Sequence, residues 1–362
     1  MTTLLYDRDI DRSSLDGQTV AVIGYGSQGE AHARNLADSG VKVVVGLRPD
    51  SASAERARSA GLSVTDPASA VASGDVVVLL VPDTAMPAIY RSEVEPNLRD
   101  GALLLFAHGF NIHFGEIDPP GSVDVGMVAP KGPGHIVRRL FEAGGGTPTL
   151  FAVHRDTTGT GRARTLAYAA AIGAGRAGVL ETTFAEETET DLFGEQAVLC
   201  GGVTALVQAG FETLVDAGYQ PELAYFETMH ELKLIVDLMW QGGLGYMRYS
   251  ISDTAEFGDY VAGPRLIDDR VRDVMRQLLG EIRDGSFARR WIADGAAGNP
   301  EFRRLRARNA NARIERVGAE LRSQMSFVDP KQPPAGWAGT EAGRAAADAE
   351  VPSAAAASGG GA

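Results

Sequence analysis

The chain has 362 residues, of which 44% are apolar and 22% are charged, and this length is enough for two globular domains with separate cores. A formal charge of −13 without a basic stripe argues against a nucleic-acid partner, and the single cysteine, Cys200, excludes an intrachain disulfide and a cysteine-rich zinc site. Because no apolar run reaches about 18 residues and the N-terminus lacks the pattern of a signal peptide, we expect a cytoplasmic protein with no membrane partner.

The first part of the chain, from residue 18 to about residue 183, alternates short apolar runs with amphipathic stretches. This alternation predicts βαβ units around a parallel sheet whose strands are buried on both faces. We expect strands at 19–23, 42–45, 75–81, 102–107, 123–128 and 149–153. We expect helices at 27–39, 51–60, 67–73, 87–98 and 157–172.

A glycine-rich turn follows the first expected strand and opens the first expected helix. It consists of Gly24, Tyr25, Gly26, Ser27, Gln28 and Gly29. In such a turn the first glycine allows a tight bend, the second lets the backbone approach a pyrophosphate, and the third lets the helix pack on the strand. The start of the helix then offers free N–H groups to the phosphates. The turn therefore predicts a dinucleotide site in a Rossmann-type domain.

The end of the second expected strand decides between the two nicotinamide cofactors. An acidic residue there usually holds a free 2′-hydroxyl, whereas this chain has Arg48 followed by Ser51 and Ser53. A guanidinium and two hydroxyls are suited to a phosphate, so we predict NADPH as the cofactor. Asp50 opposes this interpretation because its carboxylate would repel the phosphate, and either serine could instead only cap the following helix.

Polar residues follow three later strands, at the edge of the sheet where ligands of open α/β folds bind. His108 follows the fourth strand and could move a proton or orient a water, and Lys131 follows the fifth and could meet a carboxylate or a metal-bound water. The other residues that we expect beside the cofactor are Asp83, Thr84, Ala85, Met86 and Gly134.

The pattern changes after residue 183, where strand-like alternation disappears. Helical spacing is found at 186–217, 221–241 and 271–284. We therefore predict a nucleotide-binding domain over 1–183 and an all-α domain over 184–327. The remaining residues, 328–362, are rich in Pro, Ala, Gly and Ser and are expected to form a disordered tail.

Two pairs of acidic residues with i,i+4 spacing lie in the expected helical domain: Asp191 with Glu195, and Glu227 with Glu231. Like charges at this spacing repel each other on a helix. A divalent cation with oxygen ligands, such as Mg²⁺, would explain both pairs, because each pair projects its carboxylates from one helical face. The alternative is two solvated acidic faces.

Six stretches of the chain resemble ketol-acid reductoisomerase (acetohydroxyacid isomeroreductase) in its short class I form. They are residues 24–29, 107–114, 129–135, 186–196, 230–238 and 249–256, which occur in the family's order. The resemblance covers roughly residues 1–327 and leaves the tail unexplained. It implies an α/β fold with an N-terminal Rossmann-type parallel sheet, followed by an all-α, intertwined (knotted-type) domain that forms a homodimer able to assemble further.

The same resemblance implies a two-step reaction in valine and isoleucine biosynthesis. Two Mg²⁺ ions bind 2-acetolactate or 2-aceto-2-hydroxybutyrate, an alkyl group migrates, and NADPH reduces the product to a 2,3-dihydroxy acid. Two metal ions suit the migration, which needs a polarised carbonyl beside a deprotonated hydroxyl. The metal ligands implied by the motifs are Asp191, Glu195 and, supplied by the partner subunit, Glu227 and Glu231. The implied catalytic residues are His108, Lys131 and Glu231, and Ser252 would contact the substrate carboxylate.

Two other classes of protein share parts of this pattern. A metal-free β-hydroxyacid dehydrogenase also joins a Rossmann domain to a helical one, but it leaves the paired carboxylates without a role. A nucleotide-sensing interaction protein on the same scaffold would bind NADPH without turnover. Dependence on Mg²⁺ and turnover of substrate distinguish the three.

Overall fold

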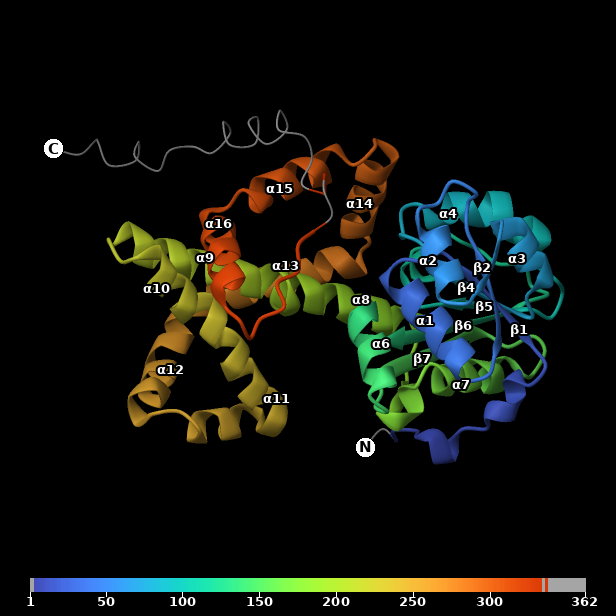
Figure 1. Cartoon of the computed structure of the whole chain (residues 1–362), viewed down its shortest axis with the longest axis horizontal. Helices are drawn as coiled ribbons and strands as arrows, with labels where there is room; N and C mark the ends of the chain where they lie inside the picture. Colours follow the sequence, from blue (N-terminus) through green and yellow to red (C-terminus); the bar gives the residue numbers. More distant parts are fainter. Residues whose placement is uncertain (1–2, 334–335, 338–362) are drawn as a thin grey trace. The chain divides into compact units, whose positions relative to one another are not determined.

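The computed structural model describes residues 3–333 and 336–337. By its internal contacts the chain divides into two compact units, residues 1–192 and 193–362 (Figure 1), which are described separately below. This division falls inside helix α8 (Phe184–Gly194), whereas the sequence placed a domain boundary at 183/184. Most of the tail expected to be disordered, 328–362, lies outside the described residues.

The first unit contains an eight-stranded sheet with the strand order β3-β2-β1-β4-β5-β6-β7-β8. Its strands are β1 (Thr19–Ile23), β2 (Lys42–Gly46), β3 (Ser63–Thr65), β4 (Val76–Leu79), β5 (Leu103–Phe106), β6 (Asp124–Pro130), β7 (Thr149–Arg155) and β8 (Val179–Glu181). The order reverses at β1, which pairs in parallel with β2 on one side and β4 on the other. Ligands of open α/β sheets bind at such a switch point. The expected fold class is confirmed.

One strand departs from the expected parallel arrangement. β7 runs antiparallel to β6, with Thr149 paired to Pro130, the last residue of β6. The chain returns from α6 (Gly134–Glu142) at the edge where β6 ended, so β7 must run back along it. The short strands β3 and β8 were not expected, because three residues are too few to show a periodic pattern.

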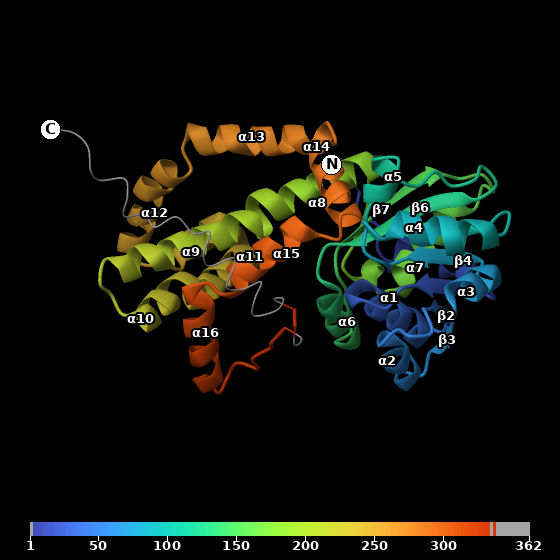
Figure 2. The ribbon, with the colours of Figure 1, turned by 90° about the horizontal axis from the view of Figure 1, so that it is seen from above.

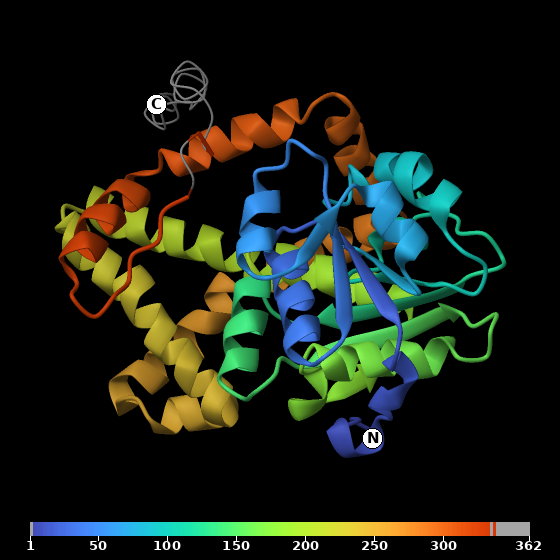
Figure 3. The same cartoon turned by 45° about the vertical axis from the view of Figure 1, so that its right-hand side comes forward.

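Helices cover both faces of the sheet (Figure 3). Besides α6 they are α1 (Ser27–Asp38), α2 (Ser53–Ser59), α3 (Pro67–Ser73), α4 (Met86–Ile89), α5 (Phe110–His113) and α7 (Gly161–Ala171). Alternate residues of the same strand enter different cores: Val20 and Val22 of β1 pack in one cluster, and Ala21 and Ile23 pack in the other. Burial on both faces explains the nearly continuous apolar runs of these strands.

In its described part, the second unit has only helices as regular elements (Figure 2). They are α9 (Gly201–Asp216), α10 (Pro221–Tyr225), α11 (Glu231–Tyr249), α12 (Asp253–Leu266), α13 (Asp269–Arg283), α14 (Ser286–Ala296), α15 (Pro300–Ala310) and α16 (Arg313–Gln324). A small core joins Phe211 of α9, Tyr225 of α10 and Ile314 of α16. Two π-helical turns, Glu195–Leu199 and Phe226–His230, interrupt the helices that the sequence predicts as continuous.

Many large apolar side chains of the second unit are exposed. Trp240 is 86% exposed, Tyr249 is 85% exposed and Phe257 is 68% exposed, and the described side chains of α11 are buried only at Met247. The chain therefore does not bury the apolar helix α11 in its own core. The helical run Phe184–Asp216 is also long and apolar enough to cross a membrane, contrary to the expectation that no stretch would qualify. One helix that meets a criterion of length and composition is weak evidence for a membrane span, and 17% of its most apolar window is buried within the structure.

Candidate functional site

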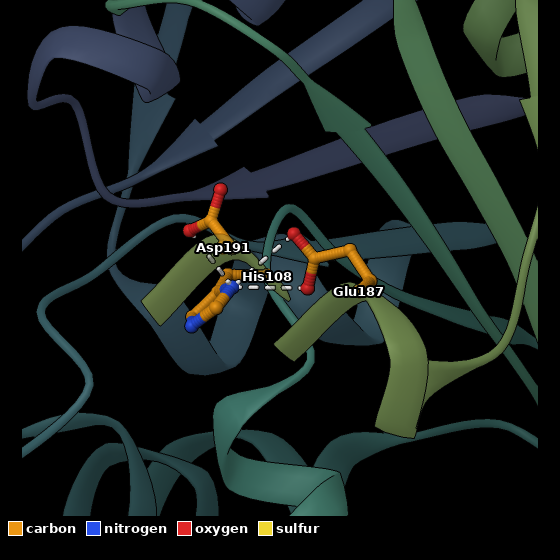
Figure 4. A group of neighbouring side chains, drawn as sticks. All are labelled: His108, Glu187 and Asp191. Carbon is orange, nitrogen blue, oxygen red and sulfur yellow. Dashed lines mark hydrogen bonds and ion pairs between the residues drawn. The ribbon is translucent and has the colours of Figure 1, made fainter. Parts of the chain in front are cut away.

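The site is built at the carboxyl ends of β4, β5 and β6, which lie side by side in register. Leu79 pairs with Phe106, and Phe106 pairs with Met127. His108 follows β5 and Lys131 follows β6, so both side chains start from the same edge of the sheet. Helix α8 starts just after β8 and carries two further acidic residues to this edge, as Figure 4 shows.

Glu187 of α8 is the centre of this cluster. Its carboxylate lies 3.0 Å from Nδ1 of His108 and accepts hydrogen bonds from the backbone N–H of Gly109 at 3.0 Å and from Nζ of Lys131 at 2.8 Å. Lys131 also donates to Oδ1 of Asp191 at 2.8 Å, and Nδ1 of His108 lies 3.6 Å from Oδ2 of Asp191. The Lys131 ammonium thus lies between two carboxylates of one helix.

Charge pairing dominates the protonation of this cluster. Burial works against the charged forms of Glu187 and His108, but their hydrogen bond and mutual attraction outweigh it. The pKa of Glu187 is lowered to about 2, and the pKa of His108 is raised. Lys131 is also desolvated, yet the charge of Glu187 and the hydrogen bond to Asp191 raise its pKa. Charge pairing therefore favours the charged forms of Glu187, His108 and Lys131 over their neutral forms.

A close contact of two backbones brings α8 to the loop after β5. A Cβ atom on Gly109 would lie 2.3 Å from Oγ1 of Thr188 and 2.8 Å from the carbonyl oxygen of Phe184. Only glycine fits this approach, which lets the Glu187 side chain reach His108. The buried Asn111 then donates to Asp83 in the loop that follows β4, and burial raises the pKa of the Asp83 carboxyl.

The donor set fits a divalent cation. One ligand atom each from His108, Glu187 and Asp191 lies within 4.8 Å of the others, and carboxylate oxygens are the ligands that Mg²⁺ prefers. The sequence reasoning missed Glu187. A signal was available, because Glu187 and Asp191 have the same i,i+4 spacing on α8 that drew attention to Asp191 and Glu195.

The other predicted metal and substrate residues lie in the second unit. Glu195 begins the first π-helical turn, and Glu227 lies in the second. The second turn ends at His230, directly before Glu231, the first residue of α11. π-turns are rare and often occur at functional sites. Glu227, Glu231 and Ser252 are exposed in the single chain, and Ser252 caps α12 by accepting a hydrogen bond from the N–H of Ala255.

The nucleotide turn has the geometry that the sequence predicts. A Cβ atom on Gly24, which has a φ of 102°, would lie 2.4 Å from the carbonyl oxygen of Leu80, while the space beside Gly26 is open. Gly26 caps α1 without a side-chain hydrogen bond, so the N–H groups of the first turn are left for a ligand.

A second helix start lies against this turn. A Cβ atom on Gly134 would lie 2.1 Å from the carbonyl oxygen of Ser27, and Gln28 donates to the carbonyl oxygen of Gly132 at 2.9 Å. The N-termini of α1 and α6 therefore meet, and their dipoles favour a dinucleotide pyrophosphate at this point.

The remaining predicted cofactor residues lie at the ends of β2 and β4. The Arg48 side chain is 80% exposed, with its Nε atom 3.9 Å from Asp50. Ser51 accepts a hydrogen bond from the N–H of Ser53, the first residue of α2. Thr84 and Ala85 precede α4, and the buried Met86 begins it with its sulfur 3.4 Å from the Asn111 amide.

Comparison with known proteins shows which family this chain matches. Residues 14–178 match the family described as acetohydroxy acid isomeroreductase, NADPH-binding domain, and residues 184–327 match ketol-acid reductoisomerase, C-terminal domain. A solved NADH-preferring ketol-acid reductoisomerase from an uncultured archean is 45% identical, with a TM-score of 0.88 over 90% of this chain and 99% of that chain. A semialdehyde dehydrogenase NAD-binding protein from Cupriavidus necator is 20% identical with a TM-score of 0.57, over 74% of this chain and 99% of that chain, which shows likeness of fold alone.

Proposed function

Because this chain belongs to the ketol-acid reductoisomerase family, and therefore binds a nicotinamide cofactor, we propose that it converts 2-acetolactate or 2-aceto-2-hydroxybutyrate to a 2,3-dihydroxy acid. The reaction couples an alkyl migration, which needs Mg²⁺, to a reduction by NADPH. Its place is the biosynthesis of valine and isoleucine in the cytoplasm. The observation that carries this proposal is the cluster of His108, Lys131, Glu187 and Asp191. Lys131 precedes Gly132, whose carbonyl oxygen accepts a hydrogen bond from Gln28 of the nucleotide turn.

Asp191 and Glu195 would hold two Mg²⁺ ions together with Glu227 and Glu231 of the partner subunit. The ions, when bound, polarise the substrate carbonyl and stabilise the deprotonated hydroxyl. Glu187 supports this assignment, because its buried carboxylate keeps Lys131 beside Asp191. Ser252 would contact the substrate carboxylate, and Glu231 would also act in catalysis.

His108 and Lys131 are the side chains that would exchange protons with the substrate or with a bound water. Nδ1 of His108 is engaged by Glu187, which leaves Nε2 as the ring atom that exchanges a proton with the site. Because the imidazole is fixed by a buried carboxylate, it keeps one orientation throughout the reaction. Lys131 Nζ holds its three protons against Glu187 and Asp191, and it can pass one to a neighbouring oxygen.

NADPH is the cofactor that we propose, on the basis of Arg48, Ser51 and Ser53. Asp50 is the opposing feature, since it lies 3.9 Å from Arg48 and weakens the positive charge of this loop. The 45% identical structure is of an NADH-preferring enzyme. The ratio of kcat/KM with NADPH to kcat/KM with NADH tests the proposed preference of this chain.

A homodimer that can assemble further, with intertwined helical domains, would cover the exposed apolar side chains of α11. Leu234, Val236 and Trp240 are 50%, 48% and 86% exposed in the single chain. Exposed apolar surface of this kind is typical of a subunit interface. Glu231 begins the same helix, so the interface would carry its carboxylate to the site of the second copy.

One assay tests the proposal. Purified protein is mixed with NADPH and 2-acetolactate, and loss of the reduced nicotinamide is followed with Mg²⁺ and with EDTA. We expect turnover that requires Mg²⁺. Equal turnover in EDTA would favour a metal-free β-hydroxyacid dehydrogenase, and nucleotide binding without turnover would favour a nucleotide-sensing protein.

A further inference from the structure

Arg56 of α2 joins the two halves of the nucleotide site. Its Nη2 atom donates to the carbonyl oxygen of Tyr25 in the glycine-rich turn at 3.0 Å and to Oγ of Ser53 at 3.4 Å. The guanidinium also lies 5.9 Å from the centre of the Tyr25 ring and 3.6 Å from the Glu30 carboxylate. These contacts place one cation between the phosphate-binding turn and the loop after β2.

The neighbouring cation, Arg48, is held far less firmly. Its side chain is 80% exposed and its ion-pair contact is with Asp50, which is 82% exposed, at 3.9 Å. Exposed pairs at such distances contribute little. Arg56 by contrast has two hydrogen bonds that define its position before any ligand arrives, which lowers the entropy lost on binding.

The geometry of Arg56 leaves donors for an anion. Its hydrogen bonds to Tyr25 and Ser53 and its ion pair with Glu30 all come from Nη2, and within the described residues no hydrogen bond or ion pair of Nη1 or Nε accompanies them. A guanidinium has five N–H donors, which suit phosphate oxygens. The hydroxyl of Ser53, which accepts from Arg56, can in turn donate its own proton to the same phosphate.

We propose that Arg56 is a specificity-determining residue that, together with Ser53, receives the 2′-phosphate of the cofactor. Glu30 opposes this role, because its carboxylate lies 3.6 Å from the guanidinium and neutralises part of its charge. The inference rests on the proposed use of NADPH and adds a residue to it that lies outside the loop of Arg48, Ser51 and Ser53.

Binding of two nucleotides tests this without catalysis. The affinities of 2′,5′-ADP and 5′-AMP, which differ by the 2′-phosphate, are measured by calorimetry on the wild-type protein and on Arg56→Gln. We expect Arg56→Gln to weaken the affinity for 2′,5′-ADP by roughly ten- to a hundredfold, as loss of a charge-assisted hydrogen bond predicts. The affinity for 5′-AMP should stay nearly unchanged. Glu30→Gln should raise the affinity for 2′,5′-ADP by a few-fold, because the neutral amide no longer offsets the charge of Arg56.

Arg58→Gln is the matched control, because Arg58 is an exposed arginine of the same helix that pairs with Glu55. It should bind both nucleotides as the wild type does. Equal weakening of both nucleotides in Arg56→Gln would show that Arg56 only tethers the Tyr25 carbonyl, and unchanged binding of both would show that the phosphate is read elsewhere. Either result overturns the inference but leaves NADPH as the proposed cofactor if the wild type still prefers 2′,5′-ADP. A wild type without that preference overturns both.

Discussion

Nδ1 of His108 lies 3.0 Å from Oε2 of Glu187, a carboxylate that is only 1% exposed. The two residues come from elements far apart in the chain, the loop after β5 and helix α8. The backbone N–H of Gly109 donates to the same oxygen, so the carboxylate is bound to one short loop through both a side chain and the backbone. This arrangement fixes the imidazole and favours its charged form.

Replacing Glu187 with Gln should lower the pKa of His108, because the neutral amide no longer stabilises the imidazolium while burial still opposes it. We expect kcat/KM for 2-acetolactate to fall about a hundredfold, within the range found for loss of acid–base function. NMR titration of the ring measures the pKa directly. Glu186→Gln, an exposed change on the same helix, is the control. An unshifted His108 pKa would contradict the proposed pairing.

Replacing Lys131 with Met should remove the ammonium that lies between Glu187 and Asp191, so that of the two cationic neighbours described above His108 remains. We expect the free energy of unfolding without metal to fall by about 2 kcal/mol. Added Mg²⁺ should raise the Tm of this variant more than that of the wild type, because the ion replaces the missing charge. Lys233→Met, which breaks an exposed pair with Asp237, should show neither effect. Equal Mg²⁺-induced shifts in Tm for Lys131→Met and the wild type would argue against a metal site here.

Asp191→Asn or Glu195→Gln should abolish the Mg²⁺-dependent isomerisation and leave NADPH binding nearly intact, since neither residue belongs to the nucleotide turn. Turnover of 2-acetolactate and the affinity for NADPH are measured on the same preparations. Turnover at the wild-type rate in either variant would contradict the two-metal proposal. Lost NADPH binding would instead point to damage of the whole unit.

Mixing inactive Asp191→Asn and Glu231→Gln subunits tests whether the site is shared between two chains. If Glu231 acts in the partner's site, a heterodimer has one site with both lesions and one intact site, so activity should return to roughly half of the wild-type value per heterodimer. Mass spectrometry of the refolded mixture shows whether heterodimers have formed. Heterodimers without activity would mean that each site belongs to one chain.

His32 offers a pH-dependent test of the first unit. Burial lowers its pKa from 6.5 to about 4, and its Nδ1 lies 2.8 Å from the Tyr168 hydroxyl. Below pH 6.5 the unfolded chain binds a proton at this histidine that the folded chain does not, so stability falls as the pH drops towards 4, by about 3 kcal/mol in total.

His32→Gln removes this titration, because the amide stays neutral. As the pH is lowered from 6.5 to 4, the unfolding free energy of the wild type should therefore fall more than that of the variant. Urea denaturation at each pH measures both values. His135→Gln, at an exposed histidine, is the control. Parallel pH profiles for the wild type and His32→Gln would show that His32 already titrates normally in the folded state.

Local pattern was enough to predict most of the first unit. The apolar runs at β1, β4, β5 and β6 are buried on both faces, so their composition alone marks them as strands of a parallel sheet. The position of His108 and Lys131 at one edge follows from the same pattern, because parallel strands end together. The glycine spacing of the turn was equally informative, since each glycine meets a requirement of the local backbone.

Tertiary structure decided the features that depend on contacts between distant segments. β7 runs against β6 because its first residue pairs with Pro130, which no local periodicity reveals. Glu187 joined the site only because Gly109 lets α8 approach, and Arg56 entered the nucleotide site only because α2 lies beside the Tyr25 carbonyl. Sequence spacing shows which residues share a face of one helix or strand. Packing between distant segments decides which of these faces meet, and this packing placed Glu187 against His108.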